Sequence, residues 1–138
     1  MWWLYALLSA FFAALTAVLA KVGIKGVDSN LATAVRTVVI LILAWSIVYF
    51  RGGLAEVHTL TRNNLLFLGL SGLATGLSWV FYFRALQLGR VSQVAPVDKL
   101  SVALAIVLSV VFLGEKLTWQ TALGAGLIIA GTLVLIRA

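Results

Sequence analysis

The stretch VSQVAPVDKLSVALAIVLSVVFLGEKLT, residues 91–118, decides how this sequence folds. Most of it is apolar over a length that crosses a lipid bilayer. Yet Asp98 and Lys99 lie inside it as neighbours, two residues after Pro96, the one proline of the chain. A charged side chain in hydrocarbon costs about 2.5–3.5 kcal/mol or more, and such residues persist where they face a cavity, a pore or another protein. The other helices are therefore expected to house this pair.

The composition defines the class of protein. Hydrophobic residues make up 63% of the 138 residues and charged residues 10%, whereas a soluble domain is about 45–50% apolar. The net charge is +6, but the basic residues are scattered singly and form no basic run with interleaved aromatic residues, so we expect no nucleic-acid partner. The sequence predicts an integral membrane protein whose first apolar run is a retained span.

Five apolar runs follow one another, each long enough to span the bilayer. They predict one all-α transmembrane domain over residues 1–138, with helices at about 2–22, 31–50, 64–86, 93–113 and 118–136. Glycine-containing turns separate most of these runs. No second domain or internal repeat is visible in the sequence.

Helical spacing places polar residues on one face of the first, third and fourth spans. The residues are Tyr5 and Ser9 in the first span, Ser78 and Tyr82 with Trp79 at the edge in the third, and Asp98, Ser101, Ala105 and Ser109 in the fourth. Three such stripes predict a polar cavity in which these residues bind substrate. In the alternative interpretation, the hydroxyl groups bond back to carbonyl groups of their own helices.

The last span has small residues at four-residue spacing, namely Ala122, Gly126 and Ala130. Small residues let helix backbones approach closely in a membrane. We therefore expect this face to pack two halves of an assembly together.

Four ionisable residues lie within or near the spans: Arg36, Arg84, Asp98 and Lys99. Neighbours on a helix point about 100° apart, so Arg36 or Arg84 is expected to pair with Asp98 in place of Lys99. The set is either a structural ion pair or part of the substrate and proton path. Pro96 either breaks the fourth helix or lies in its first turn after a Ser92 cap; the first-turn position is expected.

The odd number of spans places the two ends of the chain on opposite sides of the membrane. Counting Lys and Arg gives five on one side against three on the other, or three on each side if Lys21 and Arg84 lie inside helices. Such near-balance gives little preference for either orientation. Because many transporters consist of two inverted halves, we expect a second, inverted copy of the chain to supply the missing half.

The third to fifth spans resemble the EamA-type drug/metabolite transporter superfamily. The motif residues are Tyr82-Phe83-Arg84-Ala85-Leu86, then residues 91–96, then Leu113-Gly114-Glu115-Lys116-Leu117-Thr118 with Gln120 and Gly124. The resemblance implies a stand-alone five-span member that forms one half of a ten-helix pore and exports small metabolites. Asp98-Lys99 departs from the apolar residues usual in that family at this place.

The sequence contains no metal-ligand cluster and no nucleophile–base constellation, so we expect neither a cofactor nor an enzyme. We expect an exporter of small polar metabolites, amino-acid-like or other, in the inner membrane. It would work by alternating access at a midplane site between two antiparallel copies. Two alternatives remain at this point: a flippase for phosphate-linked sugar lipids, and a membrane accessory or assembly protein without transport.

Overall fold

The computed structural model describes residues 1–137 and is all-α over that range. Five segments are long and apolar enough to cross a membrane. They are α1 (Trp2–Gly23), α2 (Ser29–Phe50), α3 (Arg62–Leu88), the pair α4 (Val91–Asp98) and α5 (Leu100–Leu113), and α6 (Trp119–Arg137). Four of these helices begin and end within two residues of the predicted bounds, whereas the predicted helix at 93–113 is divided into α4 and α5.

Large apolar side chains cover the outside of these helices. Phe67 on α3, Phe112 on α5 and Leu127 on α6 are each between 65% and 78% exposed. In water this surface would drive aggregation, whereas lipid tails solvate it without cost. Together with the five spans, it defines a multi-pass membrane protein.

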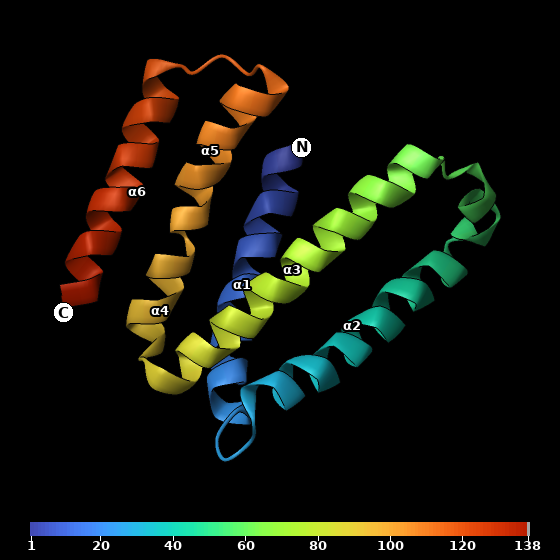
Figure 1. The fold of residues 1–138 in the computed structure, drawn as a ribbon, viewed down its shortest axis with the longest axis horizontal. Helices are drawn as coiled ribbons and strands as arrows, with labels where there is room; N and C mark the ends of the chain where they lie inside the picture. Colours follow the sequence, from blue (N-terminus) through green and yellow to red (C-terminus); the bar gives the residue numbers. More distant parts are fainter. Residues whose placement is uncertain (138) are drawn as a thin grey trace. The chain divides into compact units, whose positions relative to one another are not determined.

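The chain forms two compact units, and the first consists of Met1–Lys21 and Leu88–Ala138. In this unit α6 packs against both α4 and α5 (Figure 1). At one end of the pairing, Gln93 Nε2 donates to the Ile136 carbonyl at 3.4 Å. The end of α1 is also held, because Lys21 Nζ donates to the Gly89 carbonyl at 2.8 Å.

The turn between α5 and α6 reverses the chain (Figure 1). Gly114 ends α5 with φ +67°, a left-handed conformation that favours glycine. The Glu115 N–H donates to the Ser109 carbonyl at 3.3 Å, which closes the last turn. Thr118 Oγ1 then accepts from the Thr121 N–H at 3.2 Å and caps α6.

The second unit is Val22–Gln87 and contains α2, the 3₁₀ helix η1 (Gly53–Thr59) and most of α3. Asp28 caps α2, because its carboxylate accepts from the N–H groups of Asn30 and Leu31 at 2.9 and 3.0 Å. At the far end, η1 packs against α2. A hydrogen bond joins the turn before α2 to the end of α3, where Gln87 Nε2 donates to the Val27 carbonyl at 2.7 Å.

Candidate functional site

The fourth span is broken between α4 and α5, at a point we call the α4–α5 joint (Pro96–Lys99). Pro96 lies inside α4 and has no N–H to offer the Ser92 carbonyl one turn earlier. The chain tightens beyond it: the Lys99 N–H donates to the Pro96 carbonyl at 3.1 Å and the Val102 N–H to the Lys99 carbonyl at 3.0 Å. Both bonds span three residues, as in a 3₁₀ turn.

The expected first-turn position of Pro96 is therefore wrong. The N-cap of α4 is Arg90 and not Ser92, so Pro96 is the sixth residue of an eight-residue helix. In that interior position proline costs about 3 kcal/mol relative to alanine. The helix ends two residues later, which explains why the span divides here.

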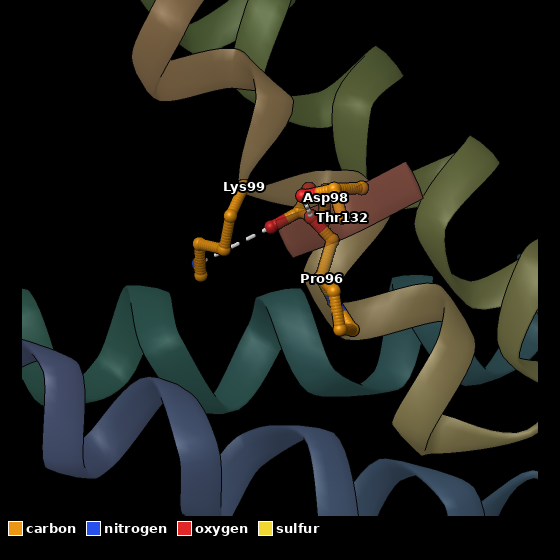
Figure 2. A network of polar contacts seen from close by, with 4 residues as sticks. All are labelled: Pro96, Asp98, Lys99 and Thr132. Carbon is orange, nitrogen blue, oxygen red and sulfur yellow. Dashed lines mark hydrogen bonds and ion pairs between the residues drawn. The ribbon is translucent and has the colours of Figure 1, made fainter. Parts of the chain in front are cut away.

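The structure pairs Asp98 with Lys99, so the expectation that Lys99 turns away from Asp98 is wrong. The expected pairing of Asp98 with Arg36 or Arg84 would join the two compact units and stays a prediction. Lys99 Nζ lies 3.3 Å from Asp98 Oδ2, with the two side chains directed toward one another (Figure 2). The rule that neighbours diverge by about 100° holds within one helix, and here one helix ends between them. Their side chains are 56% and 35% exposed, for Lys99 and Asp98 respectively.

Thr132 on α6 supports the joint from the side (Figure 2). Its Oγ1 lies 3.2 Å from the Pro96 carbonyl oxygen and 2.8 Å from the Ile128 carbonyl oxygen, and the residue is only 3% exposed. The Pro96 carbonyl already accepts from the Lys99 N–H, so Thr132 adds a second polar contact beside the break. Thr132 was not among the predicted site residues, although it is the one hydroxyl residue in the second half of α6.

A second cluster lies in the other unit, where Arg36 of α2 meets two aromatic residues of α3. The guanidinium carbon of Arg36 lies 4.4 Å from the centre of the Trp79 ring and 5.2 Å from that of Phe83. Trp79 and Phe83 are four residues apart and so lie one above the other on the same face of α3. We call these three residues the Arg36 cluster.

No carboxylate of its own unit pairs with Arg36. Among residues Val22–Gln87 its guanidinium makes neither a hydrogen bond nor an ion pair, although it interacts electrostatically with Tyr82. Arg36 is half-buried and lies seven residues beyond the start of α2, about 10 Å along the helix. Five N–H donors around a planar cation are thus held inside a span with no carboxylate partner in the same unit.

Tyr82 lies beside the Arg36 cluster, where its ring meets the Phe83 ring edge-on at 6.4 Å and it interacts electrostatically with Arg36. Arg84 donates to Gln87 Oε1 at 3.1 Å. Ser78 on α3 is exposed, as are Tyr5 and Ser9 on α1. Tyr5 and Ser9 belong to the other unit, so a role shared by all these residues stays a prediction.

Several hydroxyl groups follow the alternative interpretation and bond back to their own helix. Thr75 donates to the Ser71 carbonyl at 2.9 Å, and Ser109 donates to the Ile106 carbonyl at 2.9 Å. Ser109 belongs to the predicted polar stripe of the fourth span, so that stripe is less polar than its composition indicates.

The small-residue face of α6 is largely open. Gly126 and Ala130 are exposed and Ala122 is half-buried, and a Cβ added at Gly126 would meet no atom within 4 Å. The chain itself therefore leaves room along this face for another helix to approach.

Comparison with known proteins agrees with this class of fold. Residues 1–137 match the EamA-like transporter family. A protein of Sinorhizobium sp. described as "Uncharacterized transporter in cobO 3'region" is 52% identical over 134 residues, which cover 97% of this chain and 95% of that protein. No solved structure matches. The chain belongs to the EamA-like transporter family and is a transmembrane transporter.

Proposed function

We propose that the protein exports small polar metabolites across the inner membrane, and that the α4–α5 joint lies on their path. The observation that carries this proposal is the uncovered ion pair in a broken span. Asp98 is seven residues into its span, about 10 Å along the helix, and more than half of the Lys99 side chain is left uncovered. Contact of either charged side chain with lipid hydrocarbon would be energetically costly.

Broken helices at membrane depth occur where they line a water-filled cavity or are covered by protein. In transporters with inverted repeats, substrate and coupling ions bind at such breaks. The joint combines a break, two opposite charges and a carbonyl group held by Thr132. These features support a place on the transport path better than a role in helix packing alone.

We further propose that two copies of the chain assemble antiparallel, giving ten spans and a midplane site that opens to each side in turn. The five spans of one chain support this, since an inverted half requires an odd number. Lys21 and Arg84 both lie inside helices, within about one turn of the helix end. The Lys and Arg count therefore falls between three against three and five against three, a weak bias.

Reconstituted liposomes provide the test. Purified protein is placed in liposomes loaded with unlabelled metabolites, one class per preparation, and the entry of the labelled form is measured. We expect exchange for at least one class of small polar metabolite and slower exchange in Asp98→Asn, with Glu56→Gln in the exposed η1 helix as the matched control. Exchange that is dependent on lipid-linked substrates would indicate a flippase, and absence of exchange for all classes would favour an accessory protein.

A further inference from the structure

We propose that Arg36 binds the carboxylate group of the transported molecule, so that the substrates are small organic monocarboxylates, including amino-acid-like zwitterions. This inference rests on the proposed transport function and names the substrate class. It assigns Arg36 as a binding residue, with Trp79 and Phe83 holding its guanidinium group in place. The argument depends on the geometry of the Arg36 cluster, which lies within one compact unit.

The cluster leaves the guanidinium able to bind a planar anion. The centres of the two rings lie 4.4 and 5.2 Å from its central carbon, within the range of a cation–π interaction. The N–H donors point outward from the edge of the plane, in the fork that pairs with a carboxylate through two parallel hydrogen bonds. Within Val22–Gln87 no carboxylate side chain forms an ion pair with this cation, so a bound carboxylate can supply the acceptor.

The guanidinium does not simply extend toward the membrane surface. A lipid-facing arginine near a helix end turns its charge toward the nearer interface. Trp79 lies nine residues before the end of α3 and Phe83 five, about 14 and 8 Å along the helix. The guanidinium carbon of Arg36 lies closer to the ring of Trp79, which is the deeper of the two rings, than to the ring of Phe83. The charge is therefore held at depth, where unpaired donors are costly.

A single carboxylate fits the charge of this cluster better than a phosphate does. A phosphate monoester carries about −1.5 to −2 charges at neutral pH, whereas Arg36 supplies one positive charge. Arg84, the next basic residue on α3, already donates to Gln87. The planar, fixed fork of one arginine matches a planar monoanion in both charge and shape.

The experiment measures equilibrium binding to the detergent-purified protein, which does not depend on transport. Radiolabelled benzoate is the probe, and unlabelled benzamide and phenyl phosphate serve as competitors that replace the carboxylate by a neutral amide or a phosphate. The variants are Arg36→Gln, Arg36→Lys and the control Arg62→Gln, which removes the same charge from the exposed start of α3. Arg36→Lys keeps a cation against the rings and guards against loss of the fold.

We expect saturable benzoate binding at millimolar concentration, little competition by benzamide, and weaker competition by phenyl phosphate than by unlabelled benzoate. Arg36→Gln and Arg36→Lys should both weaken binding, by about 10- to 100-fold for the glutamine variant, as expected for the loss of hydrogen bonds to a charged group. Arg62→Gln should bind like the wild type.

Three results would overturn the inference: no benzoate binding by the wild type, equal binding by both Arg36 variants, or tighter binding of phenyl phosphate. Equal binding with a lowered melting temperature would make Arg36 a structural tie between α2 and α3. Liposome exchange separates the two proposals. Carboxylate binding through Arg36 without exchange would keep Arg36 as a binding residue and refute transport, whereas exchange that persists in Arg36→Gln would keep transport and refute the role of Arg36.

Discussion

Replacement of Pro96 by alanine should close the α4–α5 joint. Alanine restores an N–H that can donate to the Ser92 carbonyl and removes the ring that clashes with it. The two tightened bonds, from Lys99 N to Pro96 O at 3.1 Å and from Val102 N to Lys99 O at 3.0 Å, can then relax to the four-residue spacing of an α-helix. The variant should convert the span at residues 91–113 into one helix.

The size of the effect follows from the backbone. Proline in a helix interior costs about 3 kcal/mol relative to alanine, which is the upper limit here because the tightened turns already relieve part of the clash. One regained backbone hydrogen bond contributes about 1 kcal/mol net. A gain of about 1–3 kcal/mol should slow local opening of the joint by about 5- to 150-fold.

Hydrogen–deuterium exchange of the purified protein measures this opening directly. Peptides that cover residues 97–102 should exchange more slowly in Pro96→Ala, with peptides from α6 less affected. Val97→Ala is the matched control, because it changes the next side chain without adding a backbone donor. Unchanged or faster exchange in Pro96→Ala would show that proline does not cause the break.

Three further predictions concern charge, assembly and orientation. The Asp98→Asn protein should accumulate in the membrane normally, because the Lys99 side chain that loses its partner is more than half exposed. Its exchange should no longer depend on pH, and wild-type pH dependence in the variant would rule out a coupling role for Asp98. Gly126→Leu should give monomers in size-exclusion chromatography, while the control Gly131→Leu, about 140° around α6, should stay dimeric. A Cβ added at either glycine meets no atom of its own chain within 4 Å, so a dimeric Gly126→Leu would refute the packing role. Two lysines appended to the C-terminus should fix one orientation and abolish exchange unless an oppositely biased copy is co-expressed, and a C-terminal reporter found on one side only in the wild type would contradict dual orientation.

The spans could be predicted from the sequence because length and hydropathy alone define them in a membrane. The predicted helix at 31–50 began two residues late, since Asp28 provides the cap of α2. The break in the fourth span was considered but not favoured. Whether Pro96 lies in the first turn or in the interior of the helix depended on where α4 begins, and helix ends are the least certain feature of any sequence pattern.

Contacts between side chains were harder to predict than helix bounds. The pairing of Asp98 with Lys99 depends on the joint, which a straight-helix rule does not contain. The stack of Arg36 on Trp79 depends on how α2 and α3 align along their lengths, and that alignment is set by ties such as Gln87 to Val27. Both arginine and tryptophan were predicted site residues, but their contact required the fold.

The most direct test of the account asks whether the broken span faces water in the folded transporter. The chain has no cysteine, so single cysteines can be placed at Ala105 and Val107, which are both exposed on α5. They lie two residues apart, about 160° around the helix and about 3 Å along it. Ala105 shares the predicted polar face with Ser101, four residues earlier on α5, and Val107 faces away from it.

A charged, membrane-impermeant thiol reagent reacts with the thiolate, which forms only in contact with water. The account predicts that Ala105→Cys is modified in reconstituted liposomes while Val107→Cys stays unreactive, and that modification of Ala105→Cys blocks exchange. Equal reactivity of the two cysteines, or modification of Val107→Cys alone, would contradict a water-accessible path along the fourth span.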